Sequence, residues 1–150
     1  MKHVMLIGFL AATASLAAHA TLGGTVDTVE QDRVQFHAQV KATERAAFTV
    51  HEMSSANGLV VKEYADRDGT VFAVSWSGPW RPDMQQLLGT YFSSFKHDTN
   101  TANGKIAGRH PINVQRDDLV IRSEGHMRAF TGYAYLPQKL PAGLTATDFQ

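Results

Sequence analysis

Histidine is the side chain in this sequence best suited to acid–base or metal chemistry, because its pKa lies near neutral pH. Five of the seven histidines lie beyond the first 20 residues: His37, His51, His97, His110 and His126. No two of these five lie within five residues of each other, and the HExxH zinc motif is absent. The spacing therefore predicts neither a metal site nor a metal cofactor.

His51 and Glu52 place an imidazole next to a carboxylate on a predicted strand. Successive side chains of a strand point to opposite faces of a sheet, so these two could not act as a pair on one substrate. We expect one of them to face solvent and the other to meet a partner on the neighbouring strand. Both are kept as candidate binding residues.

Nucleophile and cofactor motifs are also missing. Ser75 and Ser77 lie on a predicted strand that ends at Gly78-Pro79, and the sequence has no GxSxG, GxGxxG or P-loop motif. Asp117-Asp118 lies in a predicted turn, where adjacent acids are usually solvated. Cysteine is absent, which excludes disulfides and thiolate chemistry. We therefore assign no catalytic residue and no cofactor.

Three further residues are candidates for binding a partner. Trp80 follows a chain reversal in a predicted loop, where an aromatic ring either covers the core or anchors a ligand. His126 and Arg128 share one face of a strand predicted to begin at His126, together with Phe130, Gly132 and Ala134. The small residues leave room either for the helix over residues 82–97 or for a ligand along the strand, with His126 and Arg128 at the mouth of its site.

The elements that must position these side chains indicate an α+β fold with a largely antiparallel sheet. Strands over 48–54, 59–65 and 70–77 are separated by Asn57-Gly58 and Asp68-Gly69, which predicts a three-stranded meander. Further strands are expected over 111–115, 119–123 and 127–136, followed by an irregular tail.

Helical periodicity predicts two helices. Asp27 and Glu30 resemble a capping pair for a short N-terminal helix, which passes into a strand from Val34 onward. Pro82 opens the main helix, which is expected to cover the sheet with an apolar stripe of Met84, Leu87, Leu88, Tyr91, Phe92 and Phe95.

The first 20 residues have the organisation of a secretory signal. Lys2 precedes a run of 15 uncharged, mostly apolar residues from Val4 to Ala18, and Ala18 and Ala20 are small residues at the two positions that a signal peptidase reads. The run is shorter than the about 20 residues that span a bilayer. We expect cleavage after Ala20, export to the periplasm or the medium, and a single domain over residues 21–150.

Composition limits the partners. The chain has 14 basic and 14 acidic side chains, which speaks against a nucleic-acid binder and a polybasic membrane anchor. With 43% hydrophobic residues it can form a packed core. After cleavage we expect no membrane span, whereas the protein partner or envelope ligand and the oligomeric state stay open.

Three blocks of the sequence resemble the bacterial domain-of-unknown-function family numbered 2844. They are GTVFAVSWSGP over 69–79, LLGTYF over 87–92 and GHMRAFTGYAYLP over 125–137, joined by VHE over 50–52 and EY over 63–64. The resemblance implies a small exported protein of proteobacteria with one domain. It carries no activity, cofactor or catalytic residue. Glu124 departs from the family pattern, which usually has glycine there.

Two hypotheses for the function follow. The first is a non-enzymatic binding module for a partner protein or a component of the cell envelope. The second is a small hydrolase of an envelope or extracellular polymer, using His126 or His51 with a nearby acid. A buried histidine–carboxylate pair in an open cleft would favour the hydrolase, and a flat face with exposed aromatic rings would favour the binding module.

Overall fold

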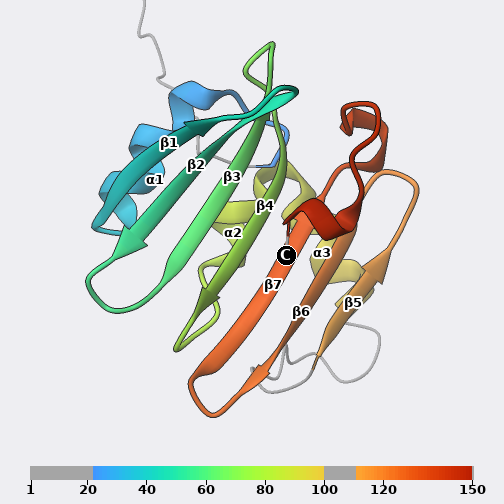
Figure 1. Ribbon diagram of the computed structural model, residues 1–150. Coiled ribbons are helices and arrows are strands. Elements are labelled where there is room, and N and C mark those ends of the chain that lie inside the picture. Colours follow the sequence, from blue (N-terminus) through green and yellow to red (C-terminus); the bar gives the residue numbers. More distant parts are fainter. Residues whose placement is uncertain (1–21, 100–110, 150) are drawn as a thin grey trace, which may run out of the picture.

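The computed structural model describes residues 22–99 and 111–149, which form one seven-stranded antiparallel sheet with helices (Figure 1). The strand order is β1-β2-β3-β4-β7-β6-β5. The predicted signal segment with Ala18 and Ala20, and His110, lie outside the described residues. The strands are β1 (Ala38–Glu44), β2 (Phe48–Ser55), β3 (Val60–Asp66), β4 (Val71–Gly78), β5 (Ile112–Gln115), β6 (Val120–His126) and β7 (Ala129–Tyr135).

The predicted meander is confirmed as β2, β3 and β4, with β1 added at its edge. Its two turns use the chemistry that the sequence indicated. Gly58 and Gly69 adopt φ of 90° and 79°, which side chains with a Cβ rarely adopt. The backbone N–H of Leu59 donates to the Asn57 side chain at 3.2 Å. Local turn signals were sufficient here because each strand pairs with its neighbour in sequence.

The N-terminal segment differs from the prediction. The helix α1 spans Val29–Gln35 after a 3₁₀ turn at Val26–Thr28, and its N-cap is Thr28. The proposed capping pair is wrong, because Glu30 instead accepts a hydrogen bond from Arg33 at 2.6 Å. The strand begins at Ala38 rather than Val34, since His37 adopts φ of 48° and turns the chain out of the helix.

The predicted helix from Pro82 is interrupted. It forms α2 (Met84–Leu88), a 3₁₀ turn (Gly89–Tyr91) and α3 (Phe92–Thr99), because Gly89 adopts φ of 50° and ends the first helix. Asp83 caps α2 by accepting from the backbone N–H of Gln85 and Gln86, so Pro82 lies just outside the helix. The apolar stripe nevertheless supplies buried residues: Met84, Leu87, Leu88 and Phe95.

The strand predicted to begin at His126 is a second correction. His126 ends β6 and pairs with Ala129, the first residue of β7. Between them Met127 and Arg128 form a two-residue turn with φ of 50° and 70°. Two positive φ values give a hairpin turn whose twist matches that of the strands, although the sequence lacks the usual Asn-Gly signal.

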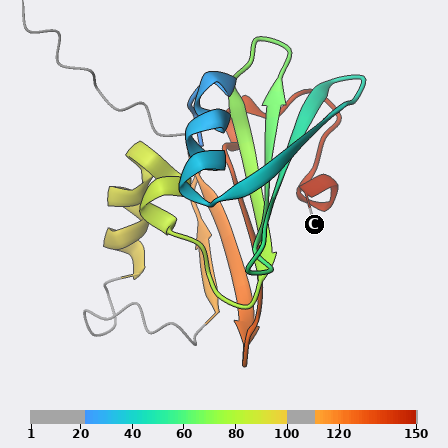
Figure 2. The same cartoon turned by 90° about the vertical axis from the view of Figure 1, so that its left-hand side faces the viewer.

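The two faces of the sheet are covered differently (Figure 2). The helices pack on one face, here called the helix face, over a core that includes Val61, Val74, Trp76, Leu88 and Ile121. The segment after β7 crosses the other face, here called the groove face, with 3₁₀ turns at Pro137–Lys139 and Ala146–Phe149. Phe149 is completely buried there, so the predicted irregular tail is a packed element.

Hydrophobic rings fix the tail on the groove face. The centroid of the Phe149 ring lies 5.2 Å from that of Tyr64, 5.8 Å from that of Phe72 and 5.8 Å from that of Tyr135.

Within residues 22–99 and 111–149, no helix is long and apolar enough to cross a membrane.

Candidate functional site

A groove with a volume of about 390 Å³ lies on the groove face beside the buried ring of Phe149. The central strands β3, β4, β7 and β6 supply the other residues that line it. They are Val60, Lys62, Ser75, Trp76, Ser77, Arg122, Glu124, Thr131, Gly132 and Tyr133. The groove therefore lies on the part of the sheet that is supported by strands on both sides.

Strand register places the side chains of the groove in two rows. Lys62 pairs with Ser75, Ser75 with Tyr133, and Tyr133 with Arg122. The next row consists of Val60, Ser77, Thr131 and Glu124. Paired residues share a face of the sheet, so each row crosses four strands, or three spacings of about 4.8 Å.

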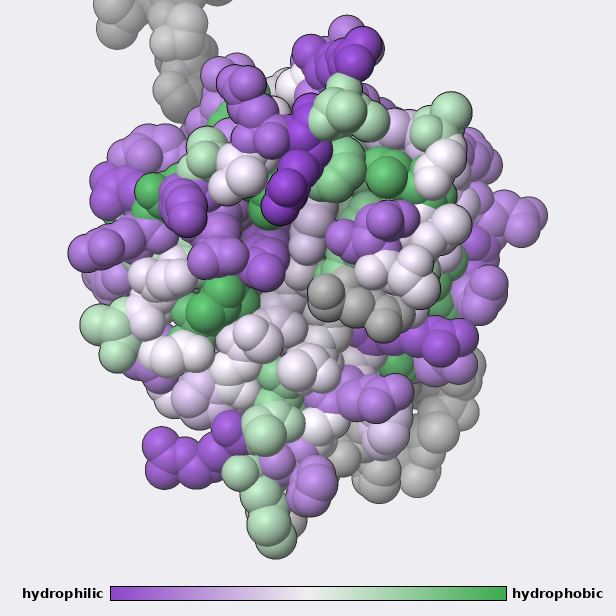
Figure 3. All heavy atoms as spheres, viewed as in Figure 1, coloured by the Kyte–Doolittle hydropathy of each residue, from purple (hydrophilic) through white to green (hydrophobic). Residues whose placement is uncertain are grey.

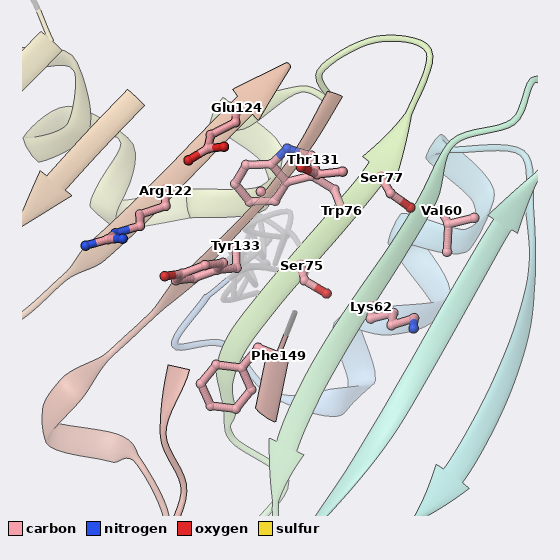
Figure 4. A pocket seen from close by; sticks show the side chains of 11 residues that line it. Val60, Lys62, Ser75, Trp76, Ser77, Arg122, Glu124, Thr131, Tyr133 and Phe149 are labelled. Carbon is pink, nitrogen blue, oxygen red and sulfur yellow. The ribbon is translucent and has the colours of Figure 1, made fainter. Parts of the chain in front are cut away.

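The charges of the groove are arranged at its two sides. Figure 4 shows the ammonium of Lys62 and the guanidinium of Arg122 pointing to opposite sides. Lys62 forms an ion pair with Glu52 on β2, with Nζ and Oε2 3.4 Å apart. Figure 3 shows residues of intermediate hydropathy in the middle of this face, and strongly hydrophilic residues interspersed with hydrophobic ones around them.

Several polar side chains of the groove have no partner within the described part of the chain. No hydrogen bond or ion pair joins the side chains of Ser77, Thr131, Tyr133, Arg122 or Glu124 to any described residue. The hydroxyl of Ser75 differs, because it lies 3.2 Å from the phenol oxygen of Tyr64. Groups that bond to nothing inside the fold are available to a ligand.

Gly132 has no side chain, and this leaves space behind the groove for the ring of Trp76. Gly132 pairs with Trp76, and the indole ring occupies the space on the helix face where a Cβ would project. A methyl group at Gly132 would also lie 2.6 Å from the carbonyl oxygen of Arg122. The small residue predicted to leave room for a helix or ligand therefore accommodates the indole of Trp76.

A buried acidic cluster lies on the helix face. Asp32 of α1 and Glu63 of β3 are both fully buried, and the side-chain amide of Gln86 from α2 donates to Asp32. Burial raises the pKa of Glu63 well above its ordinary value, and the charge of the adjoining Asp32 carboxyl adds to the rise. Neither carboxyl oxygen of Glu63 has a hydrogen-bond partner in the described structure. The cluster brings together three elements, and its carboxyl groups are buried away from solvent.

His51 faces Glu63 across β2 and β3, whereas Glu52 faces the groove side. The prediction that His51 and Glu52 point to opposite faces is thus confirmed, and Lys62 is the cross-strand partner expected for one of them. Burial lowers the pKa of His51, which favours its neutral form. A histidine does adjoin a buried carboxylate here, but that carboxylate is inaccessible.

The other candidate binding residues lie away from the groove. His126 and Arg128 are exposed at the end of the β6–β7 hairpin, and the groove is lined by neither of them. Trp80 follows β4 and is 39% exposed, so it is a partly exposed ring outside the groove. Of the five candidates, Glu52 alone adjoins the groove, through its ion pair with Lys62.

Sequence reasoning missed most of the groove. The signal was present in β6 and β7, where Arg122 and Glu124 alternate with buried Ile121 and Ser123, and Thr131 and Tyr133 alternate with Gly132 and Ala134. Recognising it needed the pairing of β7 with β4, which joins segments about 60 residues apart.

The described residues contain no group of three or more histidine or acidic side chains placed to bind a metal ion.

No curated protein and no solved structure matches the chain. A family model described as "Protein of unknown function (DUF2844)" matches residues 18–149. The match covers most of the sequence and agrees with the resemblance of the three blocks. The chain therefore belongs to the DUF2844 family of proteins of unknown function.

Proposed function

We propose that this protein is an exported, non-enzymatic binding module that holds a component of the cell envelope, or a partner carrying it, in the groove. The observation that carries the proposal is the set of polar groove side chains without a partner inside the described fold: Ser77, Arg122, Glu124, Thr131 and Tyr133. They lie on the central strands, so a rigid sheet positions them.

Export rests on the N-terminal sequence. Lys2, the run from Val4 to Ala18 and the small residues Ala18 and Ala20 are typical of a cleaved signal. The mass of the exported protein should correspond to Thr21–Gln150. Recovery of the uncleaved chain from the membrane fraction would contradict export by cleavage.

The hydrolase remains the alternative, but the geometry supports it less well. His51 lies on the helix face opposite fully buried Glu63, and His126 lies at an exposed hairpin end. Acid–base catalysis needs a group within hydrogen-bond reach of the proton that it transfers. Neither histidine shares the groove with a carboxylate.

Retention of envelope material on the immobilised protein tests the proposal. We expect material to bind the wild-type chain and the Arg128→Ala variant, but not the double variant Arg122→Ala/Tyr133→Ala. Arg128→Ala is the matched control, because it removes the same charge from the same hairpin outside the groove. Equal retention by all three proteins would refute binding in the groove.

The same experiment separates the binding module from the hydrolase. Retained material is eluted after a long incubation, and its mass is compared with that of fresh material. We expect an unchanged mass. Shortened material from the wild-type protein, but not from a His51→Ala or His126→Ala variant, would establish the hydrolase instead.

A further inference from the structure

We propose that the ligand of the groove is an uncharged, hydroxyl-rich chain, an oligosaccharide segment lying across β3, β4, β7 and β6. This inference rests on the proposed function and names the chemical class that the groove would bind. The unpaired polar groups, the balance of charge and the preformed aromatic surface each support it.

The hydroxyl groups of the groove favour a ligand that both donates and accepts hydrogen bonds. Ser77, Thr131 and Tyr133 carry hydroxyls without a hydrogen-bond partner in the described structure. Each can donate one hydrogen bond and accept others. Sugar hydroxyls have the same dual capacity. An acyl chain would leave all three groove hydroxyls unpaired and out of water, at a cost of about 1–3 kcal/mol for each buried group.

The charges of the groove favour a neutral ligand. Arg122 and Glu124 lie two residues apart on the same face of β6, a separation of about 7 Å along the strand. Within the described structure they form no ion pair with each other or with other residues. An anion attracted to Arg122 would be repelled by Glu124, and the charge of Lys62 is already balanced by Glu52.

A sugar chain satisfies both charged groups at once. One ligand hydroxyl can accept a hydrogen bond from the guanidinium of Arg122, and another can donate to the carboxylate of Glu124. The opposite charges therefore complement a row of hydroxyl groups better than they complement a phosphate or a carboxylate.

The apolar surface of the groove is held in place before a ligand arrives. The rings of Tyr133 and Tyr135 stack with centroids 6.2 Å apart, and Tyr135 contacts buried Phe149. A fixed ring loses little conformational freedom on binding. The C–H face of a sugar ring can pack on such a surface while its hydroxyls reach the neighbouring strands.

Nuclear magnetic resonance titration of the mature chain tests the inference. The probes are neutral tetrasaccharides of glucose, galactose, mannose and N-acetylglucosamine, with tetragalacturonate, inorganic phosphate and decanoate as probes of other chemistry. We expect at least one neutral tetrasaccharide to shift the backbone amide signals of the groove residues on β6 and β7 at millimolar concentration. The signals of the helix face should stay unchanged.

The outcomes separate this inference from the proposed function. If only decanoate, phosphate or tetragalacturonate shifts the groove signals, the oligosaccharide class is wrong and binding in the groove stands. If no probe shifts them while envelope material is retained through the groove, the neutral oligosaccharide is again wrong. If no probe shifts them and no envelope material is retained, both proposals fail.

Substitutions that preserve shape provide the second test. For the tetrasaccharide that binds, Thr131→Val and Tyr133→Phe should each raise Kd about fivefold, because each removes a hydroxyl and keeps the volume. Arg122→Ala should raise it about tenfold or more, whereas Arg128→Ala should leave it unchanged. The inference would be overturned if all three groove variants kept the wild-type affinity and gave spectra like that of the wild type, which would show that their folds are intact.

Discussion

The two faces of the sheet use polar side chains in opposite ways. On the helix face Asp32, Glu63 and Gln86 are buried, and the amide of Gln86 donates to Asp32, whereas neither carboxyl oxygen of Glu63 has a hydrogen-bond partner in the described structure. On the groove face Arg122 and Glu124 are exposed and have no partner in the described structure. The Gln86–Asp32 hydrogen bond therefore joins two helices on the helix face, whereas the polar groups of the groove face are open to solvent and available for binding.

The coverings of the two faces differ as well. α1 and α2 are joined by the hydrogen bond of Gln86 to Asp32, in addition to their apolar contacts. Within the described residues, the hydrogen bonds of the tail from Pro137 to Phe149 are local to the tail and to Leu136 before it. Hydrophobic contact alone holds the tail against the sheet, so it should detach more easily than the helices.

Matched substitutions of two fully buried phenylalanines give the largest expected effect. Phe95→Ala on the helix face should lower the free energy of unfolding by about 3–5 kcal/mol, because the cavity lies in the main core. Phe149→Ala should cost less, since the tail can dissociate locally while the sheet stays folded. Urea unfolding measures both changes.

Trypsin cleavage provides the control for that pair. Lys139 lies in the tail, so Phe149→Ala should speed its cleavage under native conditions. Phe95→Ala should not expose Lys139 selectively. An equal loss of stability in the two variants, with no selective cleavage, would mean that both faces unfold as one unit.

Gly132→Ala should have the next largest effect. The added methyl group overlaps the indole of Trp76 and approaches the carbonyl oxygen of Arg122, so the strands must shift. We expect a loss of about 2–3 kcal/mol in the free energy of unfolding. Thr131→Ala, one position away and exposed, is the control and should cost less than about 1 kcal/mol. Similar costs for the two would show that the indole moves aside.

The raised pKa of Glu63 predicts stability that falls as pH rises. Folded Glu63 keeps its proton at a pH where the unfolded chain has lost it, so the folded state binds more protons. The contribution is complete below the ordinary pKa of glutamate and is lost as pH rises through the folded value. The slope from one such group is at most about 1.4 kcal/mol per pH unit.

Glu63→Gln should remove that slope, because an amide does not titrate, and Glu52→Gln should keep it. Urea unfolding at a series of pH values from the ordinary pKa of glutamate upward measures the effect. His51 faces Glu63, and its lowered pKa gives a slope of opposite sign around the ordinary pKa of histidine. The comparison of the wild type with Glu63→Gln isolates the contribution of Glu63, because both proteins keep His51. Equal slopes in the wild type and Glu63→Gln would contradict the assignment.

Local signals located the strands in both halves of the sheet but missed the turn between β6 and β7. Strands β2, β3 and β4 were predicted to within about one residue, because Asn57-Gly58 and Asp68-Gly69 mark the hairpin turns that join these consecutive strands. The β6–β7 turn at Met127-Arg128 carries no such signal, and its positive φ values follow from the pairing of the flanking strands. Gly89 was placed within a helix because apolar periodicity continues across it.

The candidate site depended on long-range pairing, which local patterns do not contain. His51 and Glu52 were separated correctly because alternation along one strand is enough for that inference. Arg122 and Tyr133 become part of one groove with Lys62 only when β7 pairs with β4. Alternation within the strand over 59–65 puts Glu63 on the same face as the apolar residues Val61 and Ala65, so the burial of Glu63 could have been predicted.

The smallest expected effect is on stability in the groove. Arg122→Ala should change the free energy of unfolding by less than about 0.5 kcal/mol, because the exposed guanidinium has no partner in the described structure. The double variant His126→Ala/Arg128→Ala at the hairpin end should change it equally little. Thermal and urea unfolding of both variants measure this.

Stability and ligand binding measured on the same two variants separate a residue that supports the fold from a residue that binds the ligand. Arg122→Ala should melt like the wild type and lose the ligand, whereas His126→Ala/Arg128→Ala should melt like the wild type and keep it. A loss above about 1 kcal/mol in Arg122→Ala would mean that Arg122 supports the fold, as the Gln86–Asp32 hydrogen bond does on the helix face. Arg122 would then be a structural residue of the sheet, and the assignment of the groove as a binding site would lose the side chain that supports it most.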